Sequence, residues 1–269
     1  MPHAPSTPGA AGPAAGQRDR TPAIAAAWLL GCFALAYGFD IGRGFISDDF
    51  GWIAHSRGLA DAGTLRRLFV ETPMGFYRPM VSVSFAVNER LFGADPLGYA
   101  LTNVALVLAI AAALIRLIEG FGFGRGPALF GAALWLFNVH GIGMSLTWIS
   151  GRTSLLATLF AVLAAIAVRR DRPRLAGMWV LAALLSKEEP ILLPVVLAAW
   201  VALDAPRAGG WPRAALADVL RATWPPFTAL GVYLALRFQS TAMTPGTAPS
   251  YYALSWSPRV LAPNVLSYL

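Results

Sequence analysis

A polar stretch from residue 47 to 79 carries side chains that could do chemistry. It begins with two adjacent carboxylates, Asp48 and Asp49, and it ends with Tyr77 and Arg78 directly before a proline. A carboxylate can act as a general base on a hydroxyl group, and an arginine can bind and neutralise a phosphate. These residues suit the transfer of a group from a lipid-linked phosphate to an acceptor hydroxyl.

Two further polar stretches carry ionisable residues at the edges of apolar segments. His140 and Arg152 bracket one of them, and Lys187, the only lysine of the chain, stands beside Glu188 in the other. Charged groups are costly next to membrane spans, so their repeated placement at such edges indicates a site. Each also has a purely structural interpretation, namely a solvated acid, a satisfied polar histidine, a helix cap or a lysine that snorkels to the surface.

The composition indicates which class of protein carries these residues. Hydrophobic residues make up 57% and charged residues 13% of the 269 residues, and the mean hydropathy is +0.57. These values are typical of an integral membrane protein. The net charge of +7 arises from arginines that cluster between apolar segments, as topology signals do. We therefore expect no nucleic-acid partner.

The order of apolar segments predicts an all-α fold, a polytopic transmembrane helical bundle with about seven spans. The predicted spans are residues 21–39, 99–118, 127–139, 153–168, 175–186, 191–203 and 223–236. Assigning the arginine-rich loops to the cytoplasm places the N-terminus there and the remaining loops on one external face. On that face, a long loop over 40–98 is predicted to carry interfacial helices at 52–59, 64–70 and 79–92.

The two ends of the chain differ in composition and in the local structure that they predict. Residues 1–22 are rich in Pro, Ala and Gly and predict a disordered cytoplasmic tail. Residues 23–269 then form one transmembrane domain, with the candidate active site in its long loop. The last residues, 264–269, resemble the start of another helix, so we expect a shortened form or the N-terminal part of a longer fold.

Four strings along the chain resemble a known family. They are SDDF (47–50), GFYRPMVSVSFAVNERLFGADPLGYALTNVALVL (75–108), WISGRTSLLATLF (148–160) and LLSKEEPILLP (184–194). In this order they look like the polytopic GT-C type glycosyltransferases. The closest resemblance is to bacterial relatives of the protein O-mannosyltransferases, including the membrane-plus-tetratricopeptide-repeat proteins.

The resemblance implies an inverting glycosyltransferase with a polyprenyl-phosphate-linked sugar as donor. The acceptor hydroxyl, on a protein, glycan or lipid, would be glycosylated at the periplasmic side of a bacterial inner membrane. In the family, an acid of the first external loop lies at the reaction centre, which maps to Asp48 or Asp49. The donor phosphate would contact Arg78 and Lys187. Supporting roles would fall to Tyr77, His140, Arg152 and Glu188.

The chain departs from the family at one motif. Relatives carry a His-Pro-x-His-x-Glu pattern just before the Trp-Ile-Ser-Gly-Arg string. Here Val139, Ile142 and Met144 stand at the two His positions and the Glu position, and His140 lies one place off.

Two other classes of function stay open at this point, a transporter or flippase of a lipid-linked or anionic substrate and a non-catalytic membrane scaffold. Charges that line a path through the bilayer would favour a transporter, whereas the predicted spans are nearly free of charge. Retention of both acids, Arg78 and Lys187 argues against a scaffold. Paired acids can bind a divalent metal, but Asp48 and Asp49 alone supply too few ligands to predict a site, so no cofactor is assigned and a divalent metal stays open.

Overall fold

A computed structural model describes residues 21–57, 64–204, 213–242 and 257 of the chain. This described part is helical and contains no β-strand. The all-α class predicted from the sequence is therefore confirmed. The tail predicted over residues 1–22 lies, except for its last two residues, outside the described residues, as does the helix start predicted at 264–269.

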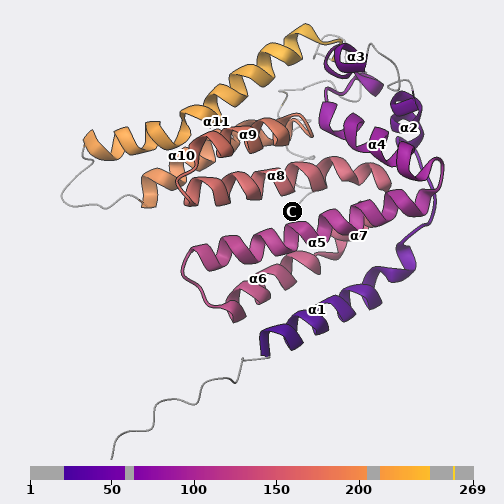
Figure 1. The fold of residues 1–269 in the computed structure, drawn as a ribbon, viewed down its shortest axis with the longest axis horizontal. Helices are drawn as coiled ribbons and strands as arrows, with labels where there is room; N and C mark the ends of the chain where they lie inside the picture. The colour runs from indigo at the N-terminus through magenta and orange to yellow at the C-terminus, as the bar shows by residue number, and fades with distance from the viewer. Residues whose placement is uncertain (1–20, 58–63, 205–212, 243–256, 258–269) are drawn as a thin grey trace, which may run out of the picture.

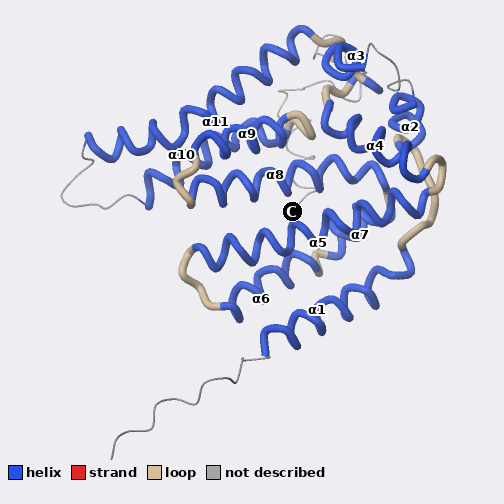
Figure 2. Tube along the Cα trace, in the orientation of Figure 1, coloured by secondary structure: helices blue, strands red, loops and turns tan. Residues whose placement is uncertain are grey.

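Eleven α-helices follow one another in the described part (Figures 1 and 2). They are α1 Thr21–Tyr37, α2 Asp49–Arg57, α3 Thr64–Val70, α4 Pro79–Phe92, α5 Pro96–Gly120, α6 Arg125–Leu136, α7 Val139–Thr147, α8 Arg152–Arg169, α9 Pro173–Leu184, α10 Leu193–Asp204 and α11 Arg213–Gln239. Short 3-10 helices lie between them: η1 Gly38–Asp40, η3 Pro73–Gly75, η4 Ile149–Gly151 and η5 Glu189–Leu192.

Three helices in the described part are long and apolar enough to cross a membrane. They cover Ala23–Asp40, Pro96–Gly120 and Ile149–Arg169. The pair α6 and α7, bent by 60° at Asn138, adds a fourth if it counts as one broken span. The chain is thus a helical membrane protein.

The remaining predicted spans fall on helices that do not meet this criterion. Helices α9 and α10 have 12 residues each, which corresponds to about 18 Å of helix. That is shorter than the hydrocarbon core, which is about 30 Å thick. Helix α11 is longer, but it contains Pro225 and Pro226 and polar residues in its first half. The count of seven spans therefore stays a prediction.

The structure has helices at the three predicted places in the long loop, and local residues explain their limits. Helices α3 and α4 have the predicted bounds, and α2 begins at Asp49 instead of residue 52. A proline stands at the first position of α4, where its missing N–H has no helical partner in any case. Gly93 ends α4 with a positive φ of 57°. Asp95 then caps α5 by accepting from Leu97 N at 3.0 Å.

Helix α8 lies in the middle of the bundle and packs against both α5 and α9. Helix α9 in turn packs against α11, with the backbones in close approach at Gly177. A Cβ atom added there would lie 2.9 Å from Pro225 O and C. Small residues allow such close helix packing in membranes.

The chain direction of these helices gives the bundle two distinct ends (Figure 1). Helices α5 and α8 both begin at the end where α2, α3 and α4 lie. Helix α9 ends there, and α11 ends beside α3, where Thr241 N donates to Val70 O at 3.2 Å. The turns after α5 and α8 lie at the other end, and the second of them carries Arg170 and Arg172. The loops with the candidate site residues therefore share one end, as the sequence predicted.

Candidate functional site

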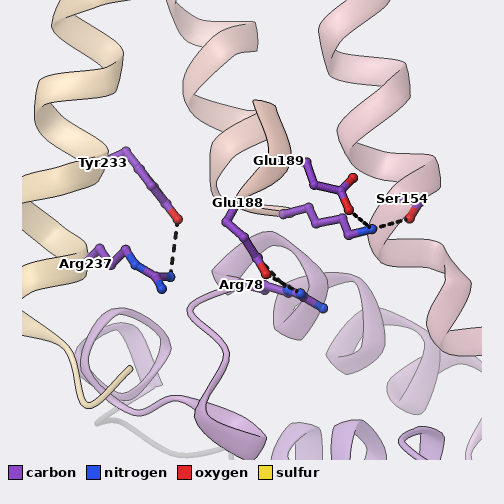
Figure 3. A network of polar contacts seen from close by, with 7 residues as sticks. Arg78, Ser154, Glu188, Glu189, Tyr233 and Arg237 are labelled. Carbon is purple, nitrogen blue, oxygen red and sulfur yellow. Dashed lines mark hydrogen bonds and ion pairs between the residues drawn. The ribbon is translucent and has the colours of Figure 1, made fainter. Parts of the chain in front are cut away.

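A network of polar side chains connects four segments at the end of the bundle that carries α3 and α4. Figure 3 shows residues from the start of α4, the start of α8, the turn after α9 and the end of α11. One backbone hydrogen bond, from Met80 N to Leu185 O at 3.0 Å, joins the first turn of α4 to the end of α9. It brings together Arg78 and Lys187, which are far apart in the sequence.

Arg78 and Glu188 form the central ion pair of this network. Arg78 Nε donates to Glu188 Oε2 at 3.1 Å and Nη2 donates to Oε1 at 2.8 Å. The guanidinium group also lies over the Phe76 ring, 4.3 Å from its centroid. Burial raises the pKa of the Glu188 carboxyl, but the hydrogen bond and charge of Arg78 outweigh this and lower the pKa overall. The pair uses two of five guanidinium N–H donors and leaves three for a ligand.

Lys187 lies beside this pair and is held by two side chains. Its Nζ donates to Ser154 Oγ at 3.0 Å and lies 2.6 Å from Glu189 Oε1. The Glu189 side chain is 70% exposed, whereas that of Lys187 is 20% exposed. The partner carboxylate is therefore open to solvent, and a competing anion can replace it on the ammonium group.

The end of α11 adds two residues that the sequence alone did not indicate. Arg237 Nη1 donates to Tyr233 OH at 3.4 Å, and the charge of Arg237 contributes to lowering the pKa of Glu188. The cluster then holds three cations, Arg78, Lys187 and Arg237, against two carboxylates, so its net charge is +1. The sequence signal that could have indicated Arg237 is its position as an arginine in the last turn of a predicted membrane helix.

Tyr77 provides a buried hydroxyl group next to this cluster. The side chain is 1% exposed, and its ring lies 6.0 Å from that of Tyr233. Within the described residues, the Tyr77 hydroxyl has no hydrogen-bond partner. Burial and the neighbouring Tyr233 raise the pKa of Tyr77 to about 12, so the group is a neutral donor. An unsatisfied buried donor is costly, and such a group indicates a missing ligand or a functional role.

The two adjacent acids lie in different environments. Asp49 is fully buried and accepts hydrogen bonds from Ile46 N at 2.9 Å, Ser150 N at 2.7 Å and Ser150 Oγ. Asp48 is only partly buried and accepts from Ser47 Oγ at 3.2 Å. Asp49 thus fixes the start of α2 to η4, whereas Asp48 keeps carboxylate oxygens available.

Helix α2 also places Asp48 on the same side of the fold as the Arg78 loop. Gly51 approaches η3 so closely that a Cβ atom there would lie 2.7 Å from the Met74 sulfur. Trp52 packs in one buried cluster with Val81 at the start of α4. The start of α2 therefore lies against the segment that leads to Arg78.

Arg152 is completely buried and belongs to a separate polar cluster. Nε donates to Asn103 Oδ1 at 2.8 Å, Nη2 to Tyr99 O at 2.7 Å, and Nη1 to Ser84 Oγ at 3.2 Å and to Asn88 Oδ1. These acceptors stand on α4 and α5. Arg152 therefore positions α4 and α5 against the start of α8, and no atom of its side chain is left exposed for a ligand.

Among the described residues, Asp48 and Asp49 make no hydrogen bond or ion pair with the Arg78 and Lys187 network. His140 is likewise separate from it. It is exposed near the start of α7 and makes no contact with the Arg78 and Lys187 network among the described residues. Of the positions that carry the family's His and Glu, Ile142 is buried and Val139 and Met144 are exposed. Apolar residues therefore replace that motif in space as well as in sequence.

No group of three or more His, Cys, Asp or Glu residues in the described ranges could hold a metal ion. Asp49 already accepts three hydrogen bonds through its two oxygens. The donor set around Asp48 is therefore poor for Mg²⁺ or Ca²⁺, which take six or more oxygen ligands.

Comparison with known proteins found two curated relatives. The chain is 26% identical to human protein O-mannosyl-transferase TMTC3 over 155 residues, which are 54% of this chain and 17% of that protein. It is 30% identical to mouse protein O-mannosyl-transferase TMTC1 over 162 residues, which are 56% of this chain and 17% of that protein. The matches therefore span about a sixth of the length of these relatives. No family model and no solved structure matches the chain. This distant similarity suggests a membrane glycosyltransferase.

Proposed function

We propose that the chain transfers a sugar from a polyprenyl-phosphate-linked donor to an acceptor hydroxyl. The observation that carries this proposal is the cationic cluster at one end of the bundle. Arg78 pairs with Glu188, Arg237 acts on the same carboxylate through its charge, and Lys187 is the next residue in the chain. The Tyr77 hydroxyl beside them has no hydrogen-bond partner among the described residues. Such a set of donors suits a phosphate group, since Arg offers a planar fork and Lys a mobile point charge. The two O-mannosyl-transferases that resemble the chain suggest mannose as the first sugar to test.

In the proposed reaction, Asp48 takes the proton of the acceptor hydroxyl. The hydroxyl oxygen attacks the anomeric carbon of the donor, and the bond from that carbon to the phosphate oxygen breaks with inversion. The lipid phosphate leaves with the bonding electrons, and Arg78 and Lys187 stabilise its negative charge. Asp48 is the better candidate for the base because the oxygens of Asp49 already accept three hydrogen bonds.

The same proposal includes the membrane topology. Seven spans with a cytoplasmic N-terminus would place the cationic cluster on the periplasmic side of a bacterial inner membrane. The concentration of arginine in the turn 169–174 at the opposite end of the bundle supports this orientation. Acceptors on that side would be a protein, a glycan or a lipid.

The test is a transfer assay with radiolabelled polyprenyl-phosphate mannose in right-side-out and inverted membrane vesicles that contain the protein. We expect Asp48→Asn to lower kcat by about 10²- to 10⁴-fold. Arg78→Gln and Lys187→Gln should each lower kcat/KM by about 10²- to 10³-fold. The matched control is Arg90→Gln, because Arg90 is exposed on the same helix as the Arg78 cap and pairs with no described residue. Wild-type rates in all three site variants would refute the mechanism.

A wild-type protein that transfers label in neither vesicle orientation would instead favour the transporter or scaffold interpretation. The variant Asp49→Asn separates the two acids. It should lower the stability of the protein as well as its activity, because an amide nitrogen then faces backbone and hydroxyl donors. Asp48→Asn should leave the stability unchanged, because that side chain accepts only one exposed hydrogen bond.

A further inference from the structure

A second basic site lies at the opposite end of the bundle from the cationic cluster. There a pocket of about 370 Å³ is lined by Arg116, Leu117, Gly120, Ile166, Arg169 and Arg170. Helices α5 and α8 both end at this pocket, and both belong to the segments that are long and apolar enough to span a membrane. A pocket between the ends of two spans lies at the level of the lipid headgroups.

Arg169 is the structural member of this pocket. Its Nε donates to Gly120 O at 2.8 Å and its Nη1 to Asp204 Oδ2 at 3.0 Å. The guanidinium group lies 5.3 Å from the centroid of the Phe121 ring, which in turn lies 5.2 Å from that of Trp200. Arg169 therefore ties the end of α5 to α8 and α10.

Arg116 and Arg170 are not explained in this way. Both are exposed, and neither side chain makes a hydrogen bond or ion pair with any residue that the structure describes. Arg116 lies one helical turn before the end of α5, inside the apolar span, where an uncompensated charge is costly. A single cation near each helix end would satisfy the negative ends of the α5 and α8 dipoles. Arg169 meets this role, because it stands in the last turn of α8 and donates to Gly120 O at the end of α5. The guanidinium groups of Arg116 and Arg170 line the same pocket and have no partner among the described residues.

The chemistry of the walls identifies the ligand. The lining holds three arginines and no acidic residue, and Asp204 pairs with one of them, Arg169, so the lining favours an anion. Leu117 and Ile166 add apolar walls on the membrane-spanning segments themselves. A free phosphate would gain nothing from these walls, whereas the glycerol and first acyl carbons of a lipid would.

We propose that this pocket binds the phosphate headgroup of an anionic phospholipid, with Arg116 and Arg170 as the two ligand-binding arginines. Basic pockets between the ends of membrane helices are suited to such headgroups. The proposal does not depend on the glycosyltransferase reaction, because it uses neither the donor site nor any residue of that site.

The test is native mass spectrometry of the full chain in a neutral detergent. Dioctanoyl-phosphatidylglycerol, dioctanoyl-phosphatidylcholine and glycerol phosphate are added in turn, and the apparent Kd of each is measured. We expect one tightly bound phosphatidylglycerol and no comparable binding of phosphatidylcholine. In Arg116→Gln/Arg170→Gln the affinity for phosphatidylglycerol should fall by about 30-fold.

The matched control is Arg172→Gln/Arg174→Gln. It removes the same charge from exposed arginines of the same turn that do not line the pocket, and it should keep wild-type affinity. Equal affinity in all three proteins would overturn the proposal, as would an equal loss in both double variants, which would indicate diffuse attraction by the whole turn. Glycerol phosphate bound as tightly as phosphatidylglycerol would overturn the lipid and assign the site to free phosphates.

Discussion

Replacing the buried Arg152 with methionine tests whether its polar cluster holds the site end of the bundle together. The change keeps a long apolar stem and removes the donors to four acceptors, on Asn103, Ser84, Asn88 and the Tyr99 carbonyl. At about 0.6 kcal/mol for an average hydrogen bond between membrane helices, four lost bonds would cost about 2.4 kcal/mol. Removing Arg152 also leaves these buried acceptors unsatisfied, at about 1–3 kcal/mol for each one that finds no other partner. Because Arg152 is fully buried, we expect a loss of about 3 kcal/mol.

The assay is equilibrium unfolding in mixed detergent micelles, with Arg174→Met as the matched control. Arg174 is exposed and has no hydrogen-bond or ion-pair partner among the described residues, so its loss should change the free energy of unfolding by less than about 0.5 kcal/mol. Arg152→Lys keeps the charge but offers three donors on a compact ammonium group instead of a planar fork. It should therefore recover only part of the loss. A free energy of unfolding for Arg152→Met within 0.5 kcal/mol of that for Arg174→Met would refute the argument.

Two further predictions concern the packing around the site. Tyr77→Phe removes a buried hydroxyl that has no partner in the described structure. Thermal unfolding should show unchanged or slightly higher stability, whereas the KM for the polyprenyl-phosphate donor should rise. A clear loss of stability would show that the hydroxyl has a structural partner. Gly177→Ala places a Cβ 2.9 Å from Pro225 O and should lower the free energy of unfolding by about 1–3 kcal/mol through overpacking. Gly231→Ala meets no atom within 4 Å and should instead raise the free energy of unfolding by about 0.5–1 kcal/mol. Equal unfolding temperatures for the two variants would contradict this packing.

The helices of the long loop were predictable from the sequence because local residues define them. Pro79 and Gly93 mark the two ends of α4, and the alternation of apolar and polar residues between them has a helical period. The polar stretch between His140 and Arg152 carries α7 and η4. Its position is set locally, since Asn138 Oδ1 caps α7 by accepting from Gly141 N at 3.4 Å.

The roles of the two acids could not be predicted, because they depend on contacts between distant segments. Asp48 and Asp49 are chemically identical neighbours, and only the pairing with Ser150, 101 positions away, separates a buried acid from an accessible one. The same holds for Arg78, whose partner Glu188 is 110 positions away. The order of spans and loops in the sequence predicted that these residues lie at one end of the bundle. It could not predict which of them pair with one another there.

The contacts at this end divide into a buried set that fixes position and an accessible set that is free to change partner. Asp49, Arg152 and the hydrogen bond from Met80 to Leu185 belong to the first set, and their polar atoms have partners within the protein. Asp48 and the carboxylate of Glu189 belong to the second. A site that binds an anion must exchange its resident carboxylates without unfolding the elements that carry its cations. Here that exchange is possible because Glu189 stands on the surface, whereas the backbone around Lys187 is anchored through Leu185 to α4.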